Sequence, residues 1–266
     1  MHLYAPRDRV VLVLFVACYL GLGALLTWQQ ERVVYRPSGP AFADCPVLRA
    51  AEPRQFNHTR FYYYEASPAA PLAVLYHGNG GSACDRGAYL APLLTAAGYS
   101  YLFVEYPGYG GDPIPPTHER MQRAVDDITT YLTAEITVPV TLIGESIGSG
   151  VASWHLSQHT PEQLILITPF TTLSEVAARQ YWFYPTRWLV RDVYDVPAAM
   201  REYRGRSLVL HGTDDRLIPT KLGIAVYEAL GGEKELALIE DAGHNNLLLD
   251  PAAQTALHTF LERATR

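Results

Sequence analysis

Short apolar runs alternate with helical stretches along most of this chain, and this alternation constrains its fold more than any other feature. Runs of about four to eight apolar residues are typical of strands buried on both faces of a parallel sheet. Between the runs, helical periodicity appears, for example from His118 to Leu132 behind a Thr117 cap. The pattern predicts an α/β fold with a mostly parallel, doubly wound sheet and flanking helices. The apolar runs are Phe56–Tyr64, Leu72–Tyr76, Tyr99–Glu105, Val138–Ile143, Leu164–Ile167, Leu208–Leu210 and Leu236–Ile239.

The segment from Val10 to Trp28 is a long apolar run in which no residue is charged. At about 1.5 Å per residue, its helical length nearly equals the hydrocarbon core of a bilayer, roughly 30 Å. Arg7 and Arg9 precede the run, and polar residues begin again at Gln29, as at the ends of a membrane span. Residues 1–32 are therefore predicted to form a single N-terminal transmembrane anchor.

Other interpretations of this segment stay open. A cleaved signal peptide normally ends in small residues, which Leu26 to Gln29 do not provide. Phe15 to Cys18 resembles a bacterial lipoprotein box, although the apolar run continues past the cysteine. A buried core helix is a third possibility. Basic residues flank both ends of the run, and the short N-terminal tail only slightly favours the outer side of the membrane for the rest of the chain.

Composition excludes several classes of protein. With 48% apolar and 18% charged residues, the chain can bury a substantial core and is not disordered. Its net charge of −6 argues against a nucleic-acid partner, because phosphate binding needs clustered basic residues. Three cysteines are too few for a disulfide framework, and their spacing fits neither a zinc site nor a redox pair. Outside a reducing compartment, Cys45 and Cys84 can pair.

The strongest chemical motif is the pentapeptide from Gly144 to Gly148, a GxSxG sequence between a predicted strand and a predicted helix. In that context the glycines permit a sharp turn that lifts the hydroxyl of Ser146 above the sheet. The motif predicts Ser146 as a nucleophile. A tight turn with a solvated serine is the structural alternative.

A serine nucleophile needs a base, and the base needs an orienting acid. Asp214 and Asp215 follow the run Leu208–Leu210, and His244 follows the run Leu236–Ile239. We expect His244 to be the base and Asp215 to be its acid, with Asp214 capping the turn or facing solvent. The order Ser146, Asp215, His244 is that of the α/β-hydrolases.

The loop after Leu72–Tyr76 reads His-Gly-Asn-Gly-Gly. Such a loop supplies one backbone donor of an oxyanion hole, and the residue after the nucleophile supplies the other. The backbone N–H groups of Asn79 and Ile147 are the predicted donors. His77 is expected to be structural.

Together, YHGNGG, VEYPGYG, IGESIG, HGTDDRLIP, AGHNN and the long segment from Pro169 to Asp195 resemble the BEM46-type branch of the α/β-hydrolases, with its ABHD13- and ABHD17-like proteins. The resemblance covers about Phe56 to the C-terminus. It implies an α/β-hydrolase catalytic domain over 56–266, with a small cap at about 169–200, joined to the anchor by a tether over 33–55. Gly80 departs from the usual alanine of the branch and should loosen its loop.

This resemblance implies a membrane-associated serine hydrolase that cleaves carboxylic esters or thioesters of acyl or lipid type through an acyl-enzyme. The chemistry requires no metal or organic cofactor. Aromatic and apolar residues of the predicted cap either line an acyl pocket or pack the cap onto the sheet. They are Trp182, Phe183, Tyr184, Trp188, Leu189 and Val190.

Two other functions remain as alternatives. The first is a catalytically idle interaction module tethered to the membrane. The second is a dinucleotide-binding oxidoreductase, because the loop from Gly78 to Ala83 fits GxGxxA and Glu105 follows about twenty residues later. His155 and His159 have the spacing of helical zinc ligands but lack an obvious third ligand, so they are expected to be surface or packing residues. The sequence does not specify the substrate or the oligomeric state.

Overall fold

The computed structural model describes residues 6–191 and 194–263. Residues 1–5 of the predicted anchor, 192–193 of the predicted cap and 264–266 at the C-terminus lie outside the described residues. The described chain contains an eight-stranded sheet in the order β1-β2-β4-β3-β5-β6-β7-β8. Pairs from β4 through β8 are parallel, and β1 and β2 are antiparallel additions at one edge. This confirms the predicted mostly parallel sheet.

The strands are β1 Glu52–Phe56, β2 Thr59–Tyr64, β3 Leu72–Tyr76, β4 Ser100–Glu105, β5 Val140–Glu145, β6 Gln163–Ile167, β7 Arg206–Gly212 and β8 Lys234–Ile239. The helices are α1 Pro6–Trp28, α2 Gln30–Val34, α3 Ala83–Ala96, α4 His118–Glu135, α5 Ile147–Leu156, α6 Leu173–Gln180, α7 Thr186–Leu189, α8 Val196–Glu202, α9 Thr220–Ala229 and α10 Pro251–Glu262. Short 3₁₀ turns, η1 and η2, cover Phe42–Asp44 and Leu247–Leu249.

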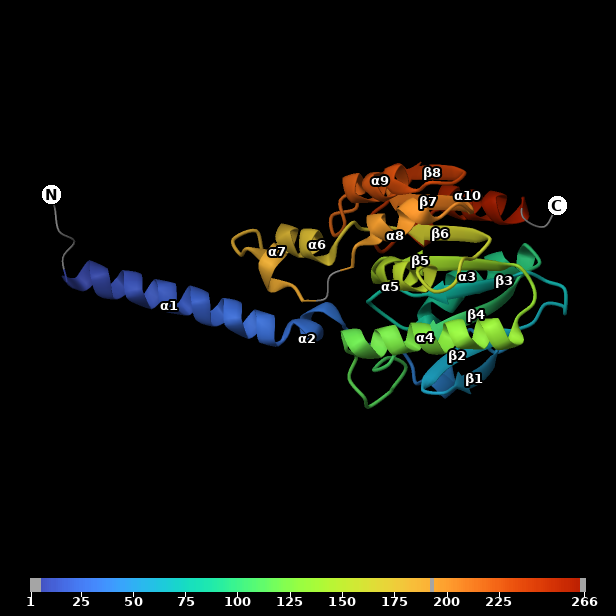
Figure 1. Ribbon diagram of the computed structural model, residues 1–266, viewed down its shortest axis with the longest axis horizontal. Coiled ribbons are helices and arrows are strands. Elements are labelled where there is room, and N and C mark those ends of the chain that lie inside the picture. Colours follow the sequence, from blue (N-terminus) through green and yellow to red (C-terminus); the bar gives the residue numbers. More distant parts are fainter. Residues whose placement is uncertain (1–5, 192–193, 264–266) are drawn as a thin grey trace.

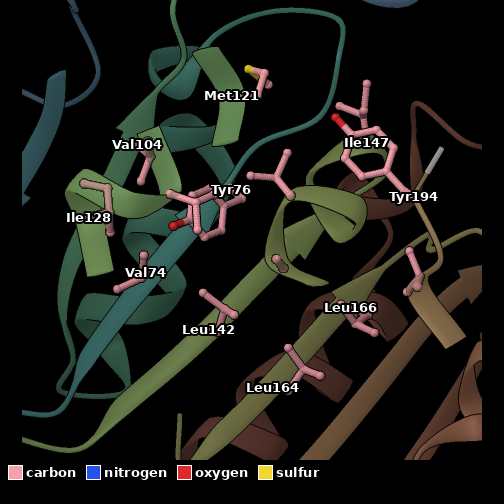
Figure 2. Close-up of a cluster of buried hydrophobic side chains, with 14 of the residues drawn as sticks. Val74, Tyr76, Val104, Met121, Ile128, Leu142, Ile147, Leu164, Leu166 and Tyr194 are labelled. Atoms are coloured by element: carbon pink, nitrogen blue, oxygen red, sulfur yellow. The ribbon is translucent and has the colours of Figure 1, made fainter. Parts of the chain in front are cut away.

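Two apolar clusters cover the two faces of the sheet, because successive side chains of a strand point to opposite faces. On β3, Leu72, Val74 and Tyr76 belong to one cluster, and Ala73 and Leu75 belong to the other. Figure 2 shows Val74 and Tyr76 among side chains of the first cluster. Helices α4, α5, α8 and α9 pack on the first face, and α3 and α10 pack on the second.

The single strand predicted over Phe56–Tyr64 is wrong, since this region forms the hairpin of β1 and β2. Asn57 takes a positive φ of 49° in the turn between them, a conformation that asparagine tolerates better than most residues. Strand β1 reads EPRQF and lies at the sheet edge, where proline and charged side chains are tolerated. Because this sequence is mostly polar, hydrophobic patterning does not predict the strand.

Helix α1 extends away from the body of the protein (Figure 1). Its stretch Arg9–Trp28 has a mean hydropathy of 2.5 and lies almost entirely outside the packed core. This helix is long and apolar enough to cross a membrane. It is the one such helix among the described residues.

The segment between α1 and β1 lies against the sheet domain. Tyr35 and Leu48 are buried in its two apolar clusters. A disulfide joins Cys45 of this segment to Cys84 in the first turn of α3. The predicted tether is therefore fixed to the domain along its length and ends in β1.

Candidate active site

Ser146 lies at the sharp turn from β5 into α5. Its φ of 51° and ψ of −118° fall in a region that residues with side chains rarely adopt. The backbone N–H of Ser146 donates to the carbonyl of Ile167 at 2.8 Å. A Cβ at Gly148 would lie 2.0 Å from the carbonyl oxygen of Tyr76, and one at Gly144 would lie 2.8 Å from the carbonyl oxygen of Gly148. The turn therefore requires both glycines.

The structure brings Ser146, His244 and Asp215 together from the carboxyl ends of β5, β8 and β7. Nε2 of His244 lies 3.1 Å from Oγ of Ser146, and Nδ1 of His244 lies 2.7 Å from Oδ2 of Asp215. With the proton on Nδ1, the imidazole donates to the carboxylate and accepts from the serine hydroxyl. This is the geometry of a general base aimed at a nucleophile.

The carboxylate of Asp215 is buried but has several donors. Its Oδ1 accepts from the backbone N–H groups of Leu217 and Ile218 at 2.9 and 2.8 Å. Burial alone raises the pKa of Asp215, but the hydrogen bonds from His211 and His244 outweigh it and hold the pKa well below its usual range. The acid is therefore ionised at neutral pH.

Asn79 and Ile147 both line the cavity above Ser146. The backbone N–H of neither residue donates to another residue within the part of the chain that the structure describes. The N–H of Ile147 also lies at the N-terminus of α5, where the helix dipole favours negative charge. Both groups can therefore donate hydrogen bonds to an oxyanion.

The loop that carries Asn79 is held by its own side chain. Oδ1 of Asn79 accepts from the backbone N–H of Arg36 at 2.8 Å and from the hydroxyl of Tyr109 at 2.7 Å. Its Nδ2 donates to the carbonyl of Val34. These bonds fix the loop despite Gly80, which we expected to loosen it. No sequence pattern indicates that residues after α1 contact this loop.

Arg86 and Glu145 form a second restraint that sequence reasoning missed. Nε of Arg86 lies 2.6 Å from Oε2 of Glu145, the residue before Ser146. Nη2 of Arg86 donates to the carbonyl of Gly80 at 2.9 Å. The pair therefore links the loop that carries Asn79 to the turn at Ser146.

A cavity of about 200 Å³ opens above Ser146. None of its lining residues carries a charged side chain, so it suits an apolar group better than an ion. Of the six cap residues singled out from the sequence, Tyr184, Leu189 and Val190 line it, whereas Trp182, Phe183 and Trp188 are exposed. The lining comprises Gly23, Leu26, Thr27, Gln30, Val33, Val34, Asn79, Ser146, Ile147, Phe170, Leu173, Val176, Ala177, Gln180, Tyr181, Tyr184, Thr186, Leu189, Val190, Leu217 and Ile218.

The remaining polar candidates have structural partners. The hydroxyl of Ser149 is buried and donates to the carbonyl of Ser146 at 2.6 Å. His77 is buried beside Glu105, with its Nε2 3.6 Å from the carboxylate. His155 is buried and accepts from the hydroxyl of Tyr76 at 2.9 Å. No cluster of side chains suited to a metal ion occurs among the described residues.

Comparisons with known proteins find similarity to hydrolases. The Hydrolase_4 family model, described as serine aminopeptidase S33, matches residues 67–193. An uncharacterized protein of Mycobacterium tuberculosis, Rv2307c, is 29% identical over 253 residues, which are 90% of each chain. Lysophosphatidylserine lipase ABHD12 of Danio rerio is 27% identical over 202 residues, which are 68% of this chain and 53% of the lipase.

Solved structures share the architecture. The esterase Pf2001 of Pyrococcus furiosus superposes with a TM-score of 0.68 at 16% identity, over 86% of this chain and 98% of the esterase. At that identity the likeness shows the fold alone. With the strand order, it shows that this chain has the α/β-hydrolase fold. The similarity to the Hydrolase_4 model over residues 67–193 and to a lipase supports hydrolase activity.

Proposed function

We propose that this chain is a membrane-anchored serine hydrolase of the BEM46-type branch that cleaves carboxylic esters or thioesters of acyl or lipid type. The observation that carries the proposal is the hydrogen-bonded series Ser146, His244, Asp215 at an apolar cavity. A serine that only forms part of a turn would not need a histidine hydrogen-bonded to its hydroxyl. Nor would it need a buried, ionised acid bonded to that histidine. The series therefore favours catalysis over the idle interaction module.

The proposed reaction is covalent acyl transfer. His244 takes the proton of Ser146 as the hydroxyl oxygen attacks the acyl carbonyl. The N–H groups of Asn79 and Ile147 hold the resulting oxyanion, and the alcohol or thiol leaves with the proton from His244. Water, deprotonated by His244, then attacks the acyl-enzyme and releases the acid. Asp215 keeps Nδ1 of His244 protonated and stabilises the imidazolium that forms in each half-reaction.

The character of the cavity supports an acyl substrate. Its walls are mostly aliphatic and aromatic, and none of its lining side chains is charged. The similarity to a protein named lysophosphatidylserine lipase agrees with a lipid substrate. The oxidoreductase alternative is disfavoured because Asn79 of this loop lines the same cavity as Ser146, and Val34, Arg36 and Arg86 hold the loop by hydrogen bonds. No cofactor is required by the proposed chemistry.

We propose residues 1–32 as the anchor, and the rest of the chain, including the connecting segment 33–55, as the catalytic unit. The disulfide Cys45–Cys84 supports a location on the oxidising side of the membrane, because such bonds do not persist in reducing compartments. The full-length protein should remain with membranes after carbonate washing. Its recovery in the soluble fraction would exclude the anchor.

Fluorophosphonate labelling tests the catalytic assignment. The wild-type protein should be labelled, and Ser146→Ala should lose the label together with about 10⁴-fold or more of the turnover. Ser149→Ala is the matched control, since its hydroxyl lies on the next helical turn and points to a backbone carbonyl. It should keep the label. Loss of the label in Ser149→Ala but not in Ser146→Ala would contradict the assignment, and absence of labelling in the wild type would favour the idle module.

A further inference from the structure

Helix α1 makes specific contacts with Phe183 and Tyr184 of the proposed cap. The ring of Tyr19 stacks on that of Tyr184, with their centroids 4.6 Å apart. The hydroxyl of Tyr184 donates to the carbonyl of Tyr19 at 2.8 Å, and the hydroxyl of Tyr19 donates to the carbonyl of Phe183 at 2.7 Å. A Cβ at Gly23 would lie 3.0 Å from the Tyr184 ring. These contacts hold the helix and the cap together in one arrangement.

The C-terminal part of α1 also forms a wall of the cavity above Ser146. Gly23, Leu26 and Thr27 line it from α1, and α2 continues the same wall. The cap lines the same cavity, mostly with apolar residues of α6 and α7. The apolar cavity is therefore enclosed partly by the helix proposed to span the membrane. A simple tether would have no reason to occupy this position.

These contacts place the cap at membrane depth. Tyr19 lies nine residues before Trp28, the end of the apolar span, which corresponds to about 13 Å along a helix. The headgroup region of one leaflet is only roughly 5–8 Å thick. A cap loop held against Tyr19 therefore reaches the hydrocarbon of a membrane that α1 crosses. Figure 1 shows the loop between α6 and α7 directed along α1, away from the sheet.

The exposed residues of the cap suit that environment. Trp182 and Trp188 are 80% and 79% exposed, and Phe183 is also exposed. Exposed tryptophans are costly in water but favourable at a membrane interface. Arg187 and Arg191 flank Trp188 in the sequence, and such long cationic side chains can extend to the headgroups.

Building on the proposed function, we propose that α1 is part of the acyl-binding site and that the acyl chain of a membrane lipid enters the cavity laterally from the bilayer, between α1 and the cap. The chain then passes Gly23 and Leu26 and reaches Ser146 without crossing water. The alternative is a substrate that enters from the aqueous side, with α1 serving only as a tether.

The test uses full-length protein in detergent micelles with p-nitrophenyl dodecanoate and p-nitrophenyl acetate. Gly23→Leu and Leu26→Trp fill the α1 wall of the cavity. Gly21→Leu is the matched control, because a Cβ at Gly21 would have no atom within 4 Å. The measured quantity is the ratio of kcat/KM for the long ester to that for the short ester.

We expect this ratio to fall at least tenfold in Gly23→Leu and Leu26→Trp and to stay within twofold of wild type in Gly21→Leu. Fluorophosphonate labelling confirms that each variant retains a folded site, and either wall variant alone suffices if the other does not fold. If Gly23→Leu or Leu26→Trp is still labelled and keeps the wild-type ratio of kcat/KM for the long and short esters, the proposed role of α1 is wrong. The proposed function would still stand. A wild-type protein that neither labels nor hydrolyses either ester would instead overturn the proposed function itself.

Discussion

Oδ2 of Asp215 lies 2.7 Å from Nδ1 of His244, whereas the adjacent Asp214 is exposed and faces Arg216. Successive residues thus have opposite surroundings, one in the proposed catalytic series and one in solvent. Asp215→Asn should lower turnover by about 10⁴-fold, roughly 5 kcal/mol, because the histidine loses the acid that fixes its tautomer. Asp214→Asn should cost less than about tenfold.

Both variants can be compared on one activated ester at pH 7 to 8, with circular dichroism to verify folding. If the Asp214 variant is inactive and the Asp215 variant is active, the acid is Asp214 and not Asp215. Equal, small losses in both would argue against a serine triad altogether.

Much of the fold and of the candidate site could be predicted because the signals are local. Ser146 lies in a motif whose glycines are required by close backbone contacts, and Asp215 and His244 follow apolar runs that form neighbouring strands. Parallel strands bring their carboxyl ends to one edge, so chain order alone places these residues together. Their catalytic roles remain proposals.

The remaining features arise from docking between distant segments, which leaves no local pattern. The bonds from Val34 and Arg36 to the oxyanion loop join residues more than forty positions apart. The cap was expected either to line a pocket or to pack on the sheet, yet Trp182 and Trp188 do neither. Periodicity reports which residues are apolar, but not which apolar surface meets a membrane instead of a core.

The Arg86–Glu145 pair should position the oxyanion loop. Lysine at position 86 retains the charge but cannot hold Glu145 and the Gly80 carbonyl in the same forked geometry. Arg86→Lys should therefore lower kcat by about tenfold with little change in KM, since the loop acts mainly on the transition state. Arg123→Lys, on the exposed surface of α4, is the control and should behave as wild type. A rise in KM alone would indicate a role in substrate binding instead.

His155 should make stability depend on pH. Burial, together with nearby His159, lowers the pKa of His155 to about 3. Because the unfolded chain binds this proton near pH 6.5 and the folded chain does not, the stabilisation is present above pH 6.5 and is lost as pH falls towards 3. The free energy of unfolding should drop by about 2 kcal/mol between pH 7 and 5 from this residue alone.

Urea denaturation at both pH values tests this dependence. His155→Gln removes the titration, while its side-chain oxygen can still accept from the hydroxyl of Tyr76. The variant should show a shallower decrease in stability than wild type. Parallel curves for the two proteins would show that His155 does not titrate between these states.

The disulfide Cys45–Cys84 should stabilise the catalytic unit. It closes a loop with a sequence separation of 39, and a cross-link of this span typically contributes about 2–4 kcal/mol. The double variant Cys45→Ala, Cys84→Ala should lose about that amount in urea denaturation. Cys18→Ala, on α1, should leave the stability unchanged. If Cys45 and Cys84 react with a thiol reagent without prior reduction in protein isolated from membranes, the bond does not form in the cell.

The exposed cap aromatics should matter only when the substrate lies in a membrane. Trp182→Ser with Trp188→Ser removes the two most exposed indoles of the cap, neither of which lines the cavity. For a long-chain acyl ester embedded in phosphatidylcholine vesicles, this double variant should lose about tenfold in initial rate, because its cap is less stable at the interface. Hydrolysis of soluble p-nitrophenyl butyrate should change by less than twofold. Equal losses on both substrates would mean that the tryptophans support the fold of the cap and not its contact with the bilayer.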